Sequence, residues 1–296
     1  MRPMNLRRSW LFVGAADHEA IKASNRSCAD ACIQEFEDFC VPELRQEARR
    51  IMPDVLSDWR ARGIVATVRI NPLENPDGLK DLDAAVKADA DAILIPKANT
   101  KEQMLALEKH INELEKRFAR PIGSTDIIPN IEQAKGLVHS HAVLSASKQI
   151  VGSLVASEDM AVSLNSPRQK NSEMLNLVRC AFHISCCAAG ITSIDMPYTF
   201  TDDEGVRQQT ILARDIGMVS KSTVNASHCE IINEIMTPSR DEVEEVRQLV
   251  GVFDKARDAG KGQVIYSGTK VEVPTYLNAM LVIVRYLALS KYDHLK

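Results

Sequence analysis

Short apolar runs rich in β-branched residues alternate along the chain with longer stretches in which apolar residues recur at helical spacing. Strands buried on both faces are apolar throughout, so the alternation predicts parallel strands joined by helical crossovers. The expected strands cover residues 10–13, 31–36, 64–70, 92–96, 126–131, 150–155, 191–195 and 217–223. The expected helices lie around residue 20 and over residues 42–62, 78–88, 100–118, 133–146, 172–189 and 203–216.

Eight such alternations favour an α/β fold of the closed (β/α)8 TIM-barrel type. An open doubly wound sheet is the alternative, but the first strand leads into Val13-Gly14-Ala15-Ala16-Asp17 and not into a G-x-G-x-x-G turn. Helix starts are expected at three capping boxes, in which a hydroxyl and a carboxylate or amide satisfy free backbone amides. They begin at Thr100, Thr201 and Ser239.

The alternation of strands and helices ends beyond Val224. We expect residues 1–235 to form the barrel domain and residues 236–296 a C-terminal helical extension. The segment 276–289 is apolar nearly all the way round, and a helix of that kind must be covered on several sides. Because a filled barrel has no room inside for it, we expect this helix to pack on a neighbouring subunit.

Composition narrows the class of partner. The 36 Lys+Arg and 40 Asp+Glu give a formal net charge of −4, with no basic cluster suited to nucleic acid or to an anionic membrane. The apolar stretches 10–16 and 279–284 are far shorter than the ~20 residues of a membrane span. Seven cysteines without a CxxC pair indicate reduced thiols and a cytoplasmic protein.

Charged side chains follow most of the expected strands. In a barrel these positions lie on the face where active sites form, because the loops after the strands gather there. Crowded carboxylates repel one another unless a cation lies among them, and oxygen donors without a Cys or His motif suit Mg²⁺ or Mn²⁺. Arg69 and Lys97 are left to bind an anion. The residues concerned are Glu35, Glu37, Asp38, Arg69, Asn71, Lys97, Glu132, Glu158, Asp159 and Asp195.

The order and spacing of these motifs resemble the citrate lyase beta-subunit-like branch of the HpcH/HpaI aldolases, which includes malyl- and citramalyl-CoA lyases. The resemblance covers nearly the whole chain. It rests on the segments 8–13, 37–38, 68–72, 95–97, 131–132, 157–159, 193–195 and 233–239.

The resemblance implies a modified (β/α)8 barrel assembled as a homotrimer or hexamer, with Mg²⁺ held by Glu132 and Asp159. The implied activity is carbon–carbon cleavage of a 3-hydroxyacyl thioester, such as citryl-, malyl- or citramalyl-CoA, to an acyl thioester and a 2-oxo acid. Arg69, Glu132 and Asn71 are then the candidate substrate-binding residues. Glu37 and Asp38, the candidate base or water-orienting groups, join Arg69 and Lys97 as the candidate catalytic residues.

Three positions depart from the family pattern. Relatives commonly have Val-Pro-Gly where this chain has Val13-Gly14-Ala15, an Asp in place of Glu35, and Ile-His-Pro in place of Val224-Asn225-Ala226. The first and last of these departures lie in loops where the acyl carrier is expected to bind, so we expect the specificity for the carrier to differ. The residues expected to bind the metal and the substrate carboxylate are retained.

Three other functions remain open. Lys97 at a strand end suits a Schiff-base aldolase that needs no metal. A 2-oxo-acid aldolase acting on free acids is the second, and a non-catalytic binding subunit of a lyase complex is the third.

Overall fold

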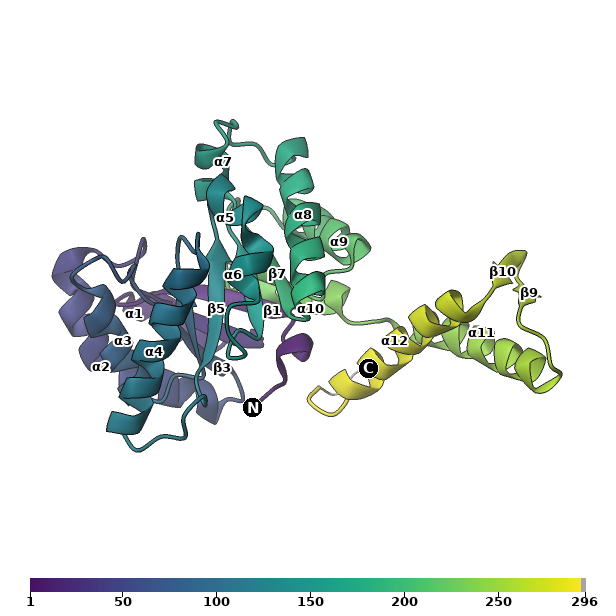
Figure 1. Cartoon of the computed structure of the whole chain (residues 1–296), viewed down its shortest axis with the longest axis horizontal. Coiled ribbons are helices and arrows are strands. Elements are labelled where there is room, and N and C mark those ends of the chain that lie inside the picture. The colour runs from purple at the N-terminus through teal and green to yellow at the C-terminus, as the bar shows by residue number, and fades with distance from the viewer. Residues whose placement is uncertain (294–296) are drawn as a thin grey trace. The chain divides into compact units, whose positions relative to one another are not determined.

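The computed structural model describes residues 1–293, and the chain divides into two compact units, Met1–Glu234 and Ile235–Lys296. In the first unit eight parallel strands close into a barrel, in which each strand pairs with the next and β8 pairs with β1 (Figure 1). This confirms the expected (β/α)8 barrel and excludes the open sheet. The strands are β1 (Ser9–Gly14), β2 (Ala31–Glu35), β3 (Val65–Arg69), β4 (Ala92–Ile95), β5 (Asp126–Ile131), β6 (Gly152–Val155), β7 (Thr192–Tyr198) and β8 (Ser220–Thr223).

Helices occupy the connections between the strands, as a barrel of this type requires. The α-helices of this unit are α1 (His18–Ser24), α2 (Arg45–Ala61), α3 (Gly78–Lys87), α4 (Lys101–Arg117), α5 (Ala134–Val138), α6 (Ser140–Leu144), α7 (Glu158–Ser163), α8 (Glu173–Ala189), α9 (Asp203–Ile216) and α10 (His228–Met236), which runs two residues past the boundary. Single 3₁₀ turns form at η1 (Met4–Leu6) and η2 (Pro42–Leu44).

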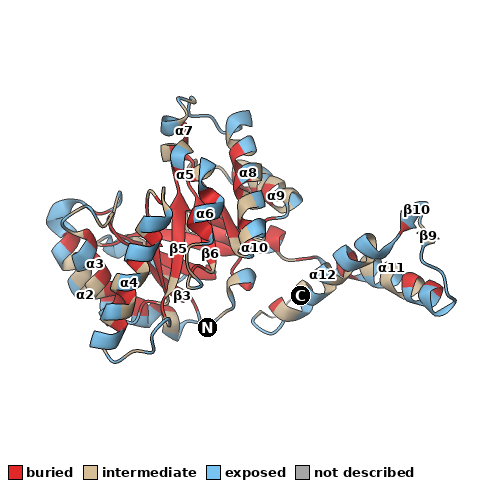
Figure 2. Cartoon of the chain, in the orientation of Figure 1, coloured by how far each residue is buried: buried red, intermediate tan, exposed pale blue. Residues whose placement is uncertain are grey.

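The barrel interior is filled by large apolar side chains, among them Trp10, Ile33, Leu94 and Ile128. Figure 2 shows the strands as the most completely buried part of this unit. Alternate residues along each strand face inward, so the positions that follow this apolar layer on β2, β3 and β5 carry polar side chains into the carboxyl-terminal mouth.

The structure corrects several expected boundaries. The helix expected over 133–146 is two short helices, because His139 at their junction has φ −100° and ψ 10°, outside the helical region. Helices α7 and α10 were not expected. Asp202, not Thr201, caps α9, its carboxylate accepting from the Gly205 amide, whereas the capping boxes at Thr100 and Ser239 form as expected.

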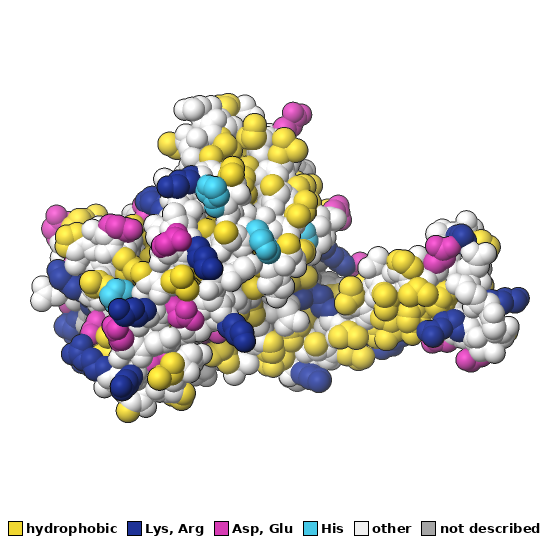
Figure 3. Space-filling model, in the orientation of Figure 1, with side chains coloured by type: hydrophobic (Ala, Val, Ile, Leu, Met, Phe, Trp, Pro, Cys, Tyr) yellow, Lys and Arg dark blue, Asp and Glu magenta, His cyan; other side chains and the backbone are white. Residues whose placement is uncertain are grey.

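The second unit is an antiparallel pair of helices joined by a small hairpin. Tyr276 packs against Phe253 with ring centroids 5.1 Å apart, and Arg285 donates to the Met236 carbonyl oxygen at 3.1 Å. Figure 3 shows hydrophobic side chains gathered on the surface of this unit, and Leu281 on its last helix is 67% exposed. The elements are α11 (Arg240–Asp258), β9 (Val264–Tyr266), β10 (Thr269–Val271) and α12 (Val273–Leu289). No helix within residues 1–293 is long and apolar enough to cross a membrane.

Candidate active site

Arg69, the last residue of β3, lies at the centre of a cluster of acids in the barrel mouth. Its guanidinium pairs with Glu35 and Glu132, whose side chains are fully buried, and Arg69 Nη1 is 3.1 Å from Glu132 Oε1. On the other side, Arg69 Nη2 is 3.1 Å from Asp38 Oδ2 and Nη1 is 3.4 Å from Glu37 Oε2. Burial alone would lower the pKa of Arg69, but the surrounding carboxylates outweigh it and raise the pKa. Arg69 is therefore a permanent cation.

Glu132 follows β5 and is shielded from solvent beneath this cluster. Its Oε1 accepts from Arg69, and its Oε2 accepts from the Lys97 backbone amide at 3.1 Å. Burial raises the pKa of Glu132 to about 8; Arg69 opposes the shift, while the carboxylates of Glu37 and Asp159 add to it. Without a further cation, part of this site holds a proton near neutral pH.

Lys97 follows β4 with a backbone φ of +52°, a conformation that non-glycine residues keep only where their surroundings enforce it. Here the amide is held by Glu132, and the side-chain Nζ lies 2.5 Å from Glu37 Oε1. Partial burial lowers the pKa of Lys97, but the bond to Glu37 and the nearby acids reverse this, and the net shift is upward. A Schiff-base lysine needs a depressed pKa, so the geometry disfavours that chemistry.

A pocket of about 360 Å³ opens beside this cluster and is reached by Arg69, Asp38 and Asp159. Asp159 lies in the first turn of α7, directly after β6. Phe12 and Val224 contribute to an apolar wall. The pocket therefore combines two arginines, three carboxylates and an apolar surface, which is the composition of a small-molecule site.

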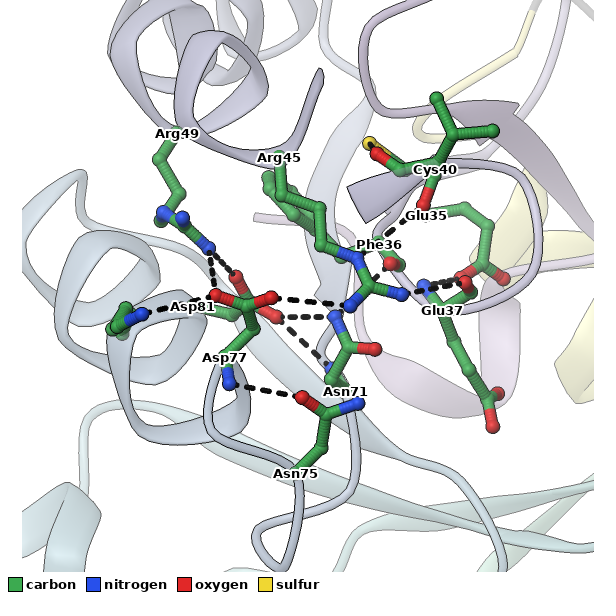
Figure 4. Close-up of polar contacts among 12 residues, drawn as sticks. Glu35, Phe36, Glu37, Cys40, Arg45, Arg49, Asn71, Asn75, Asp77 and Asp81 are labelled. Atoms are coloured by element: carbon green, nitrogen blue, oxygen red, sulfur yellow. Dashed lines mark hydrogen bonds and ion pairs between the residues drawn. The ribbon is translucent and has the colours of Figure 1, made fainter. Parts of the chain in front are cut away.

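Two residues expected at the mouth are elsewhere. Asn71 is buried, and its amide nitrogen donates to the Phe36 carbonyl oxygen and to Asp81 Oδ2, so the structure does not bring it into the pocket (Figure 4). Asp195 was expected at a strand end, but β7 continues to Tyr198 and the carboxylate is fully buried. It pairs with Arg179 on α8 at 2.7 Å and with Lys221 on β8 at 2.6 Å, and it belongs to the packing of the barrel wall.

The residues expected from the sequence include Glu158 but not Arg168 and Thr199, which line the pocket beside it. Arg168 Nε lies 3.0 Å from Glu158 Oε1, and its Nη2 donates to the Thr199 hydroxyl at 3.1 Å. Its guanidinium lies 4.1 Å from the centroid of the Phe200 ring. These residues come from loops after β6 and β7, whose sequences have no periodic pattern. The one sequence signal for this group is the charge of Arg168 in a polar loop.

The donor set of the mouth suits a hard divalent cation. Glu132 and Asp159 supply carboxylate oxygens, and the buried Asn130 Oδ1 has no hydrogen-bond partner in the part of the chain that the structure describes. Within residues 1–293, no three His, Cys, Asp or Glu side chains are arranged to hold a metal by themselves. This fits Mg²⁺, which takes one or two protein carboxylates and keeps water or substrate oxygens as its other ligands.

The fold and this mouth define a (β/α)8 barrel enzyme that presents an arginine among carboxylates. Residues 8–226 match the family model for HpcH/HpaI aldolase/citrate lyase, and the chain belongs to that family. The family assignment and its lyase relatives place the chain among the lyases.

Individual relatives extend over nearly the whole chain. Citrate lyase subunit beta of Escherichia coli K12 is 30% identical and covers 96% of this chain and 94% of its own length. The L-malyl-CoA/beta-methylmalyl-CoA lyase of Rhodobacter capsulatus is 27% identical over 98% of this chain and 97% of its own. The structure of protein CitE from Mycobacterium tuberculosis, in complex with magnesium, acetoacetate and coenzyme A, superposes with a TM-score of 0.75. It is 22% identical and covers 94% of this chain and 97% of that one.

Proposed function

We propose that this protein is a Mg²⁺-dependent carbon–carbon lyase that cleaves a 3-hydroxyacyl thioester to an acyl thioester and a 2-oxo acid. The observation that carries the proposal is that Arg69 and Asp159 line the pocket while the buried Glu132 pairs with Arg69 next to it. The relatives support the substrate class, because their names include a citrate lyase subunit and a malyl-CoA lyase. Citryl-, malyl- and citramalyl-CoA are the substrates to be tested.

Glu132 and Asp159 are the residues that would hold the metal. A carboxylate has about four lone-pair sites, so Glu132 can accept from Arg69 and Lys97 and still offer an oxygen. Mg²⁺ held by these residues would supply positive charge to stabilise an alkoxide developing on the substrate hydroxyl. The same charge would offset the repulsion between Glu132, Glu37 and Asp159.

Arg69 binds the carboxylate that remains in the 2-oxo acid. Its planar guanidinium matches a carboxylate by two parallel hydrogen bonds. Of its four acidic partners, Asp38 is the one with a half-exposed side chain, at 51%. An incoming substrate carboxylate therefore displaces Asp38 from Arg69 Nη2 and leaves the buried pairs in place.

Glu37 is the base in this proposal. Its carboxylate is held between Lys97 Nζ at 2.5 Å and Arg69 Nη1 at 3.4 Å, beside the pocket. Removing the hydroxyl proton allows the carbon–carbon bond to break, with the electron pair leaving on the thioester enolate. Asp38, displaced toward solvent, is the second residue that can accept this proton.

The test is a panel of 3-hydroxyacyl-CoA thioesters and matching free hydroxy acids, assayed for released 2-oxo acid and released CoA with and without Mg²⁺. We expect 2-oxo acid from at least one thioester, loss of activity with EDTA, and loss in Glu132→Gln but not in Glu173→Gln, an exposed control. Activity that survives EDTA with a borohydride-trapped adduct at Lys97 would overturn the metal mechanism. Cleavage of free acids alone would favour the thioester-independent aldolase, and silence throughout would favour the binding subunit.

A further inference from the structure

The loop that carries Glu37 and Asp38, residues 36–40, is bound on the side away from the pocket by a partly buried ionic network (Figure 4). Arg45, in the first turn of α2, donates from Nε to the Cys40 carbonyl oxygen at 3.3 Å and from Nη2 to the Glu37 carbonyl oxygen at 3.4 Å. Asn71 donates to the Phe36 carbonyl oxygen at 3.0 Å. Side chains from two other segments thus bind three of the five carbonyl groups of this loop.

Two aspartates of the α3 region hold these donors in turn. Arg45 Nη1 lies 3.1 Å from Asp77 Oδ2, and Asp81 Oδ2 accepts from both the backbone and the side-chain nitrogen of Asn71, at 3.1 and 2.7 Å. Arg49, one helical turn beyond Arg45, bridges the pair, with its Nη1 2.6 Å from Asp81 Oδ1 and 3.4 Å from Asp77 Oδ1.

The burial of Arg45, Asn71 and Asp81 in this network needs an explanation. Asp81 is fully buried, and burial raises its pKa although Asn71 and Arg49 bind the carboxylate. A buried ion pair contributes little net stability compared with apolar packing, and one recognised use for it is to fix a single geometry. The Asn71 amide nitrogen is occupied by the Phe36 carbonyl oxygen and Asp81, and neither Arg45 nor Asp81 lines the pocket, so direct substrate binding does not account for these residues.

The geometry to be fixed is that of the two candidate proton acceptors. Glu37 must meet Lys97 and Arg69 together, at 2.5 and 3.4 Å, while the neighbouring Asp38 reaches Arg69 from the solvent side. Inside the barrel, the loop is also tied by the Glu37 amide, which donates to Glu35 Oε1 at 2.5 Å. The position of Glu37 is therefore fixed by Glu35 on the barrel side of the loop and by Arg45 on its other side.

We propose that Arg45 and Asn71, anchored by Asp77 and Asp81, are positioning residues that set Glu37 and Asp38 against Arg69 and Lys97. This inference rests on the proposed function for its catalytic consequence, but the ordering of the loop does not depend on it. It also assigns Asn71 a role different from the substrate contact expected from the sequence.

The first arm of the test measures the loop directly. Arg45→Lys keeps the charge but loses the fork that reaches three acceptors, and Asn71→Ser shortens the donor. We expect amide hydrogen exchange in residues 36–40 to accelerate about tenfold or more in both variants. Exchange should be unchanged in Arg50→Lys, a matched control on the exposed face of the same helix, where Arg50 pairs with Glu47. Unchanged exchange in Arg45→Lys and Asn71→Ser would overturn the proposal, whether or not the enzyme is a lyase.

The second arm measures catalysis by folded protein, quantified by circular dichroism. With the thioester that the wild type cleaves, we expect kcat to fall about 10- to 100-fold while KM changes less than about twofold. In a Glu37→Gln background, the further loss caused by Arg45→Lys should disappear, because both act through one group. A lower melting temperature with unchanged kcat would show a purely structural role. A wild type inactive on every thioester would refute the proposed function, while the exchange arm would still decide the loop.

Discussion

At the scale of single residues, the site consists of one buried arginine whose positive charge is paired with several carboxylates. Arg69 meets Glu35, Glu37, Asp38 and Glu132, so its removal would leave buried carboxylates without a partner. Breaking a buried pair from one side is much more costly than replacing both members. Effects on binding and on stability are therefore coupled at this position.

The variant Arg69→Lys tests whether the site needs the planar guanidinium or only a positive charge. The ammonium keeps the positive charge but cannot bind a carboxylate through two parallel bonds or reach acids on two strands at once. We expect KM for the 2-oxo acid in the reverse reaction to rise about 100-fold and the free energy of unfolding to fall by about 2–4 kcal/mol. Steady-state kinetics and urea unfolding measure the two effects. A variant with wild-type KM would show that the substrate carboxylate binds elsewhere.

Glu132 makes the metal-free protein sensitive to pH. Its pKa is about 8 in the folded protein and 4.5 in its ordinary state. Between these values the folded chain holds a proton that the unfolded chain has released, so stability falls as pH rises through this window. We expect a decrease on the order of 5 kcal/mol in EDTA, measured by urea unfolding across the window. Glu132→Gln should lose this component of the slope. An identical slope in the variant would show that other groups cause it.

At the scale of elements, the strands could be predicted and the polar contacts could not. Apolar runs locate all eight strands because both faces of each strand are buried, and the strand ends then place Arg69, Glu132 and Asp159 at the mouth. The error at Asp195 arose because a charged residue followed shortly by Pro197 resembles a strand end, and only the pairing of Tyr198 with Thr223 on β8 shows that the strand continues. Asn71 comes directly after a strand, which is also where a substrate-binding residue would lie. Its partner Asp81 lies on α3, and no local sequence pattern shows that this helix packs close enough to bind Asn71.

Gly78 allows the start of α3 to pack closely against the backbone of Asn71 and Pro72. A Cβ built on Gly78 would lie 2.3 Å from the Pro72 carbonyl oxygen and 2.9 Å from that of Asn71. We expect Gly78→Ala to destabilise the protein by about 2–4 kcal/mol, because backbone must move before the helix can pack. Gly251→Ala on α11, where a Cβ meets nothing within 4 Å, should instead stabilise by about 0.5–1 kcal/mol. Thermal unfolding of the two variants tests the pair, and equal melting temperatures would contradict the close packing.

At the scale of the whole molecule, the expected homotrimer or hexamer remains a prediction, and α12 offers a way to test it. The residues Val273, Leu277, Leu281, Val284 and Leu287 of this helix are each 47–67% exposed, and contiguous apolar surface of this kind marks an interaction site. We expect Leu277→Glu combined with Leu281→Glu to lower the mass measured by light scattering to that of one chain, with the helical circular dichroism signal kept. Lys261→Glu, at an exposed polar position of the same unit, should leave the mass unchanged. A wild type that is already monomeric would refute the predicted assembly, and an unchanged mass in the double variant would show that another surface holds the subunits together.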